Sequence, residues 1–244
     1  MLSYLRLEIR RSLRDVRFIV LVMAWPVGAY LLFSTVFGNS GGAEGLSPKV
    51  GIMVAMACFG AIGAALNATG PRIAVERQVG WLRQLRLTPL AAWKVLVARI
   101  VSAVMLTLPS IALIFIAAFL AEGVRFSLTT WIELAAVVAV GSLPFAAIGV
   151  LLGCVGGGDG VQGFSLVVYL VLSALGGLWM PVALLPSPMQ TLAHLLPSNG
   201  LASVGWHVVG GTASLGGGVL VLACWLVAVG AVAVVASRRL AVRA

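Results

Sequence analysis

The chain has 244 residues, of which 61% are hydrophobic and only 9% are charged, and its mean hydropathy is +1.11. Soluble domains are about 45–50% apolar and about 25% charged, so this chain lacks the polar surface that a water-soluble globule of its size needs. The composition excludes a secreted domain, a cytosolic enzyme and a disordered tail, and it indicates a protein that lies in a bilayer. The formal net charge of +9 then concerns membrane sidedness and not nucleic acid.

Residues 1–17 predict an amphipathic helix at the membrane interface. Leu5, Ile9 and Leu13 share one face at helical spacing, and several arginines lie beside that face. Such a helix buries its apolar side in the acyl boundary and turns its arginines toward lipid phosphates. We expect it to anchor the chain, and a lever that contacts a cytoplasmic partner is the alternative.

The rest of the chain divides into six apolar runs of about 20 residues, the length that crosses about 30 Å of hydrocarbon. The predicted spans are 18–37, 50–70, 100–121, 131–153, 161–180 and 208–236. The second span is expected to end at Pro71, and the last could begin near residue 208 or near residue 219. The sequence therefore predicts an all-α membrane protein with one transmembrane domain over residues 1–244.

The stretch between the fifth and sixth spans is rich in helix breakers. It carries four prolines and the pair Asn199-Gly200, which interrupt any continuous helix. We expect an irregular or re-entrant segment on the outer side of the membrane.

Basic residues are unequally shared between the two sides that this division defines. With both termini cytoplasmic, 14 of the 16 lysines and arginines fall on the cytoplasmic side, and only Lys49 and Arg125 fall outside. This asymmetry is typical of multi-pass membrane proteins. A composition rich in Arg, Ala and Gly favours a bacterial source, so we expect the cytoplasmic (inner) membrane of a bacterium.

The segment 74–90 joins the second and third spans and predicts a short amphipathic helix. It ends at Thr88-Pro89, because the residue before a proline is biased away from the α conformation. The whole loop is about 28 residues long, which is more than most loops need. On the residues alone, a solvated basic loop that only sets the topology is an equally good interpretation.

Two motifs in the chain are similar to those of a known family, the ABC-2 type transporter permeases. Between spans two and three the similar residues are Glu76-Arg77-Gln78-Val79-Gly80, Leu85 and Thr88-Pro89-Leu90. At the outer end of span five they are Met180-Pro181-Val182-Ala183-Leu184-Leu185-Pro186, followed by Leu196-Pro197. The layout of an interfacial helix followed by six spans also resembles that family.

The resemblance implies a role for each motif. The first would be a coupling helix between spans two and three that docks on a nucleotide-binding subunit, with contact positions at Glu76, Arg77, Gly80, Arg83, Thr88 and Pro89. The second would be an outer re-entrant turn marked by Pro181, Pro186 and Pro197.

No nucleotide-binding motif is present in the chain. A Walker A loop needs a lysine after a glycine-rich run, and neither Lys49 nor Lys94 follows one. The resemblance therefore implies that ATP and Mg are bound by a separate ABC ATPase subunit, and that this chain is a permease and not an enzyme. We expect no catalytic residue, cofactor, metal or nucleic acid on this chain. Six spans are half of the family's usual twelve, which implies a second permease subunit, identical or similar, set in membrane lipid.

The function implied is ATP-driven export of a hydrophobic or amphiphilic substrate such as a drug, an antibiotic or a lipid-like compound. An ion- or proton-coupled carrier is one alternative, and it should need Glu133 or another buried polar group. A non-transport membrane scaffold is the other. A membrane serine protease is disfavoured, since Ser165 is followed by leucine where such enzymes have glycine.

Overall fold

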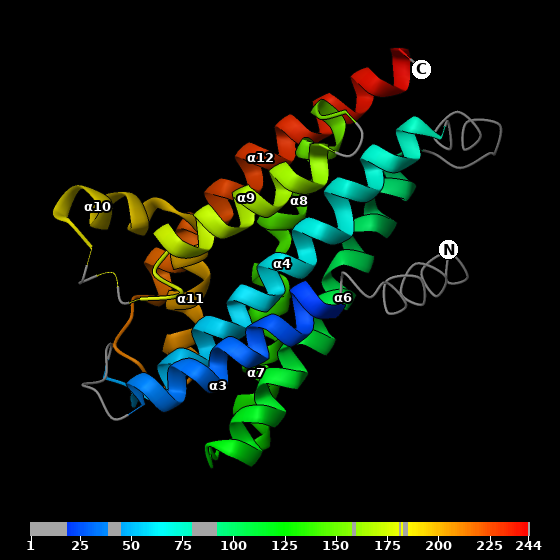
Figure 1. Ribbon diagram of the computed structural model, residues 1–244. Helices are drawn as coiled ribbons and strands as arrows, with labels where there is room; N and C mark the ends of the chain where they lie inside the picture. Colours follow the sequence, from blue (N-terminus) through cyan, green and yellow to red (C-terminus); the bar gives the residue numbers. More distant parts are fainter. Residues whose placement is uncertain are drawn as a thin grey trace.

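The computed structural model describes residues 19–38, 45–79, 92–157, 160–180, 182 and 185–243, and no strand occurs within these ranges (Figure 1). The elements are η1 (Ile19–Ala24), α3 (Trp25–Phe37), α4 (Pro48–Gln78), α6 (Ala92–Ala121), α7 (Leu128–Gly141), α8 (Leu143–Val155), α9 (Gly160–Leu175), α10 (Ser187–Leu195), α11 (Pro197–Val208) and α12 (Leu215–Arg243). The predicted interfacial helix over residues 1–17 lies outside the described residues.

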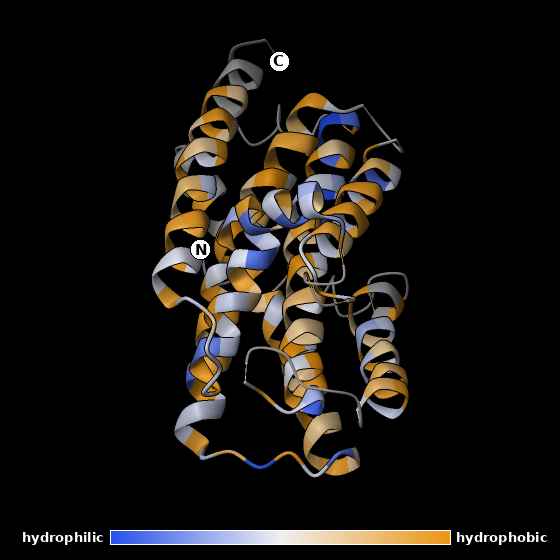
Figure 2. Cartoon of the chain, turned by 90° about the vertical axis from the view of Figure 1, so that its left-hand side faces the viewer, coloured by the Kyte–Doolittle hydropathy of each residue, from blue (hydrophilic) through white to orange (hydrophobic). Residues whose placement is uncertain are grey.

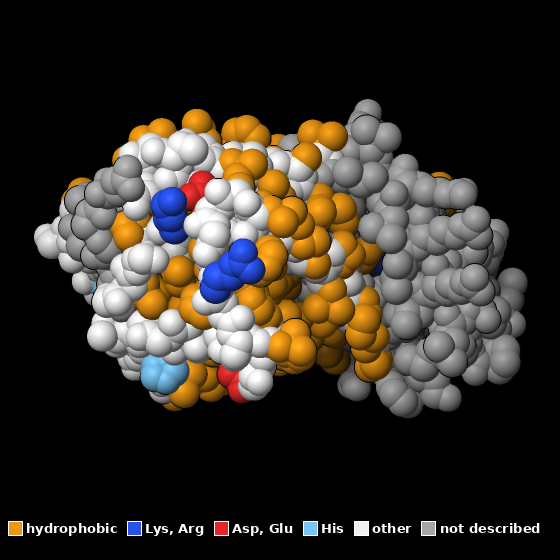
Figure 3. Space-filling model, turned by 90° about the horizontal axis from the view of Figure 1, so that it is seen from below, with side chains coloured by type: hydrophobic (Ala, Val, Ile, Leu, Met, Phe, Trp, Pro, Cys, Tyr) orange, Lys and Arg blue, Asp and Glu red, His pale blue; other side chains and the backbone are white. Residues whose placement is uncertain are grey.

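The described helices include four that are long and apolar enough to cross a membrane: Pro48–Gln78, Arg99–Ala121, Leu128–Val155 and Leu215–Ala236. Val22–Phe37 and Gly160–Leu175 are apolar but shorter. Hydrophobic residues cover most of the helical ribbon (Figure 2). Seen from below, the described part of the surface has broad hydrophobic areas and few charged side chains (Figure 3). The fold is therefore an all-helical membrane fold, as the composition predicts.

Helix α4 is the centre of the bundle. It packs against η1, α3, α6, α8, α9 and α11. Its most apolar stretch is 78% buried, whereas the corresponding stretch of α12 is only 6% buried. The chain therefore organises itself around α4, and α12 presents most of its apolar surface outward.

Helix α4 continues beyond Pro71, where the second span is predicted to end. The helix runs through Pro71 to Gln78. A proline removes one backbone N–H, but membrane helices tolerate it because neighbouring groups satisfy the freed carbonyl. Glu76 and Arg77 therefore lie on the last turns of α4 itself and not on a separate helix.

The fourth predicted span is divided in two. α7 ends at Gly141 and α8 begins at Leu143, and Ser142 between them donates its hydroxyl to the carbonyl of Ala139 at 2.6 Å. Pro144 has no N–H to continue the helical pattern, which explains the break.

The fifth and sixth predicted spans differ from the observed helices at their outer ends. α9 ends at Leu175 and not at residue 180, because a turn follows in which Gly177 adopts a φ of +78°. α12 begins at Leu215, between the two starting points left open by the sequence. Gly210, with a φ of +91°, lies in the turn between α11 and α12.

Candidate functional site

Two clusters of charged residues join α4 to α6, one at each end of this antiparallel helix pair. We name them the Arg99 cluster (Glu76, Arg77 and Arg99) and the Glu122 cluster (Ser34, Lys49 and Glu122). At a rise of 1.5 Å per residue, the two ion pairs lie about 40 Å apart along α4 and about 35 Å apart along α6. Both distances exceed the roughly 30 Å of a hydrocarbon core, so each cluster lies near a membrane surface.

The Arg99 cluster lies where α4 ends and α6 begins. The guanidinium of Arg99 forms an ion pair with the carboxylate of Glu76, and the exposed fractions of the two side chains are only 6% and 13%. An ion pair so far removed from water depends on both partners, since a buried charge without its partner is costly. This contact fixes the end of α4 to α6.

Arg77 fixes the same end of α4 to α8. Its Nη1 donates to the carbonyls of Gly153, Cys154 and Gly156 at 2.9, 2.7 and 2.9 Å. The last carbonyls of a helix have no partner within the helix, and the negative end of the helix dipole favours a cation there. Three helices are therefore joined through two adjacent residues of α4.

The predicted coupling-helix positions are only partly within the described chain. Glu76 and Arg77 are described, and their side chains contact α6 and α8 of the same molecule. Gly80, Arg83, Thr88 and Pro89 lie outside the described residues. A contact of any of these positions with an ATPase stays a prediction.

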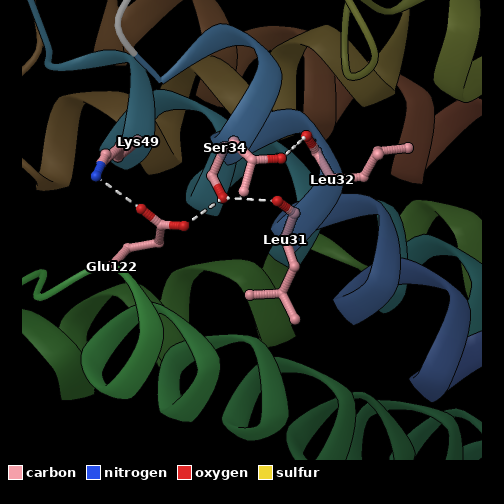
Figure 4. A network of polar contacts seen from close by, with 6 residues as sticks. Leu31, Leu32, Ser34, Lys49 and Glu122 are labelled. Carbon is pink, nitrogen blue, oxygen red and sulfur yellow. Dashed lines mark hydrogen bonds and ion pairs between the residues drawn. The ribbon is translucent and has the colours of Figure 1, made fainter.

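The Glu122 cluster joins three segments at the opposite end of α4 (Figure 4). Lys49 Nζ lies 2.8 Å from Glu122 Oε2, and the Ser34 hydroxyl on α3 donates to Glu122 Oε1 at 2.7 Å. The Glu122 side chain is 9% exposed and that of Lys49 is 39% exposed. The ammonium of Lys49 and the hydroxyl of Ser34 hold the pKa of Glu122 below its ordinary value.

We expect acid to abolish the stabilisation that the Glu122 cluster provides. A carboxyl whose pKa is lowered by folding stabilises the fold above its ordinary pKa, and this contribution is lost as the pH falls through the lowered value. Because Lys49 is partly exposed, the ion pair is worth at most about 1 kcal/mol. Glu122→Gln should lower the melting temperature by on the order of 2–4 °C at pH 7. A difference from wild type that persists in full below the folded pKa would contradict this assignment.

The stretch predicted as an irregular or re-entrant segment forms two helices over most of its described residues, α10 and α11. Pro186 caps α10 and Pro197 is the first residue of α11, positions where a missing N–H costs nothing. Pro181 lies outside the described residues. α11 returns into the bundle, where Trp206 Nε1 donates to the carbonyl of Gly51 on α4 at 3.1 Å. The proline-marked turns therefore delimit two helices.

α4 and α8 approach closely through glycine. A β-carbon on Gly149 would lie 2.0 Å from Thr69 Oγ1 and 2.9 Å from the carbonyl oxygen of Leu66. Thr69 Oγ1 also donates to the carbonyl of Ala146 on α8 at 3.2 Å. Gly149 therefore serves the packing of two helices within the chain.

The sequence reasoning missed both ion pairs. It treated Arg99 as one of many cytoplasmic charges and Lys49 as one of two basic residues on the outer side. A signal was available, since each pair consists of opposite charges that flank two consecutive antiparallel spans at matching depths. Neither pair needs a long-range prediction of the fold.

No carboxylate lies deep within a described span. Glu133 is exposed near the start of α7, and Glu76 and Glu122 lie at helix ends. Within the described ranges, no group of His, Cys, Asp and Glu is arranged to hold a metal ion. The described polar groups thus point to helix fastening at the two ends of α4.

Taken together, the apolar helices and the charges at their ends define a multi-pass helical membrane protein. The family model described as "ABC-2 type transporter" matches residues 2–199. The chain belongs to the ABC-2 type transporter family, and it is a membrane transport permease. It is similar to the Bacillus subtilis (strain 168) protein described as "Putative transport permease YvfS", with 28% identity over 219 residues, 90% of this chain and 89% of that protein.

Proposed function

We propose that this permease is the membrane subunit of an ATP-driven exporter in a bacterial cytoplasmic membrane. It would move a hydrophobic or amphiphilic compound, and a separate ABC ATPase subunit would bind ATP and Mg. The single observation that carries the proposal is the fastening of the α4–α6 pair at both ends. The loop between these two helices is the segment that resembles a coupling helix.

A loop transmits a force only if the helices that carry it respond together. The Arg99 cluster joins α4 to both α6 and α8 immediately before that loop. The Glu122 cluster joins the far ends of α4 and α6 to α3. An ATPase that pushed on the loop would therefore displace a braced group of helices and would not bend α4 alone.

The proposed membrane topology has six spans and two cytoplasmic termini. It counts Val22–Phe37 and Gly160–Leu175 as spans, although a 16-residue helix is only about 24 Å long. The charge asymmetry of the sequence supports this topology. We further propose that two permease subunits assemble, and the largely unburied apolar surface of α12 is available to lipid or to a second subunit.

The positions of Glu122 and Glu133 favour this proposal over an ion-coupled carrier. Such a carrier needs a titratable group within the membrane that alternates between the two sides. Glu122 is held by Lys49 and Ser34 at a helix end, and Glu133 is exposed.

Gly80→Trp is expected to abolish the association with the ATPase without affecting membrane insertion. An indole at this position would obstruct a helix that must seat closely on another protein. The protein, tagged and expressed in its own host, should be purified in mild detergent with a stoichiometric Walker A subunit, and Gly80→Trp should reduce recovery of that subunit and the ATPase activity at least tenfold. Glu76 is left unchanged, because its loss would also break the ion pair with Arg99.

Gly51→Trp is the matched control. A β-carbon on Gly51 meets nothing within 4 Å, and this residue lies at the opposite end of α4. Gly51→Trp should still be purified with the ATPase subunit. Equal recovery of the companion with Gly80→Trp would overturn the coupling assignment, and recovery of a folded oligomer without any ATPase would overturn the ATP-driven function.

A further inference from the structure

Helix α9 turns its hydroxyl groups inward and its apolar side chains outward. Ser165, Tyr169 and Ser173 follow one another at four-residue intervals and are buried. Phe164 and Val167, on the other side, are more than half exposed. This arrangement suits a helix that faces lipid, yet it places the Ser165 and Tyr169 hydroxyls against α4.

Two of these hydroxyls have no hydrogen-bond partner. They are Ser165 Oγ and Tyr169 Oη, each of which is fully removed from solvent. Ser173 differs, because its hydroxyl donates to the carbonyl of Tyr169 at 2.7 Å. Buried polar groups are nearly always hydrogen-bonded, and an exception calls for an explanation.

The opposing surface of α4 presents glycine at both positions. A β-carbon on Gly63 would lie 2.9 Å from Tyr169 Cζ, and one on Gly70 would lie 3.1 Å from Ser165 Oγ. Asn67, between the two glycines, uses its amide to donate to the carbonyl of Gly63. We name the contact formed by Gly63, Gly70, Ser165 and Tyr169 the α4–α9 seam.

The aromatic ring of Tyr169 is well placed although its hydroxyl is not. The ring stacks on Phe59 with a centroid distance of 4.5 Å and an interplanar angle of 17°. The ring therefore favours the closed seam, whereas the hydroxyl disfavours it. Opposed contributions of this kind are expected where two arrangements of a helix pair are close in free energy.

We propose that the α4–α9 seam is a hydration site that opens when α9 separates from α4. In the open arrangement water enters the seam and hydrogen-bonds to the Ser165 and Tyr169 hydroxyls. The closed packing is then one of two states of the molecule. The opening does not depend on the proposed function, although its use in transport rests on that function.

The test measures how fast a hydrophilic maleimide labels a thiol on the buried face of α9, about one turn beyond the seam residue Tyr169. Ser173→Cys places the thiol on the buried face of α9, and mass spectrometry of the residue-173 peptide distinguishes it from the native cysteines. The protein is labelled in membrane vesicles from its own host. Because water must reach the thiol, the rate reports the open population.

The seam residues should shift this rate in opposite directions. Tyr169→Phe and Ser165→Ala remove a hydroxyl that only the open state satisfies, so each should slow labelling about tenfold, equivalent to about 1.4 kcal/mol. Gly63→Ala forces the Tyr169 ring away from α4 and should accelerate labelling about tenfold. Gly163→Ala, whose β-carbon meets nothing within 4 Å, is the control and should leave the rate unchanged.

Equal rates in the parent, Tyr169→Phe and Ser165→Ala would overturn the hydration site. If Gly63→Ala lowers the amount of folded protein, the two variants that only remove an oxygen decide the question. Adding ATP to inverted vesicles separates the two proposals: an unchanged rate would contradict ATP-driven movement, while the opposite shifts among the variants would still support the seam.

Discussion

Gly149→Val is expected to remove the folded protein from the membrane. A side chain at this position cannot be accommodated by a rotamer change alone. Its β-carbon would lie 2.9 Å from the Leu66 carbonyl oxygen and 3.3 Å from the Gly70 amide nitrogen, which are backbone atoms of α4. The helices would have to separate, at a cost beyond the about 1–3 kcal/mol of ordinary overpacking. The measurement is the yield of monodisperse protein in size-exclusion chromatography of detergent-extracted membranes.

Gly163→Val is the matched control for this substitution. It adds the same side chain to a membrane helix, but the space around its β-carbon is open. Its yield should be close to that of the parent. In Gly149→Ala, the additional change Thr69→Ala removes the nearest contact, at 2.0 Å, and should restore part of the yield. A normal yield of Gly149→Val would show that α4 and α8 are not packed as described.

The all-helical membrane class could be predicted from the sequence, because it follows from the composition and from the length of the apolar runs. The packing glycines of α8 could also be predicted, since small residues at four-residue spacing allow backbones to approach. Gly149 meets Thr69 of α4 across such a contact. These features depend on local patterns that a single chain displays without knowledge of its neighbours.

The helix ends could be predicted less accurately than the helical class. Pro71 lies inside α4, whereas Pro144 is the second residue of a new helix after a break, although both are prolines in apolar runs. The difference depends on whether neighbouring helices hold the chain straight, which is a property of the packed bundle. The two unpartnered hydroxyls of α9 could not be predicted from the sequence either, because a serine in an apolar span is ordinarily a helix-packing residue.

Only some residues of the candidate site could be predicted from the sequence. Glu76 and Arg77 were singled out by resemblance, but the partner of each was not. Arg99 was grouped with the other basic residues, and the carbonyls at the end of α8 have no signature in the sequence at all. Opposite charges that flank consecutive spans could have indicated the ion pair of Glu76, whereas the carbonyls that Arg77 binds require knowing which helix ends meet.

The ion pair between Glu76 and Arg99 provides the second large effect. Glu76→Gln would leave the guanidinium of Arg99, whose side chain is only 6% exposed, without a counter-charge. Removing one partner of a buried pair costs about 3–5 kcal/mol, mainly because the remaining charge is desolvated. The melting temperature of the purified protein should fall by on the order of 10 °C at neutral pH. Arg125→Gln, which removes a cation over the Phe119 ring at the molecular surface, is the control and should change the melting temperature by a few degrees at most.

A double variant distinguishes the structural role of this pair from the proposed role in transmission. Glu76→Leu combined with Arg99→Leu removes both charges, and a buried pair replaced by apolar residues is often neutral or stabilising. We therefore expect the melting temperature to return to that of the parent or above. The pair could also transmit movement from the loop to α6. In that case the double variant, although as stable as the parent, should retain its companion ATPase but couple ATP hydrolysis to export less tightly. Full recovery of export together with stability would restrict the Glu76–Arg99 ion pair to holding the helices together, and the transmission route would then have to run through Arg77 and α8.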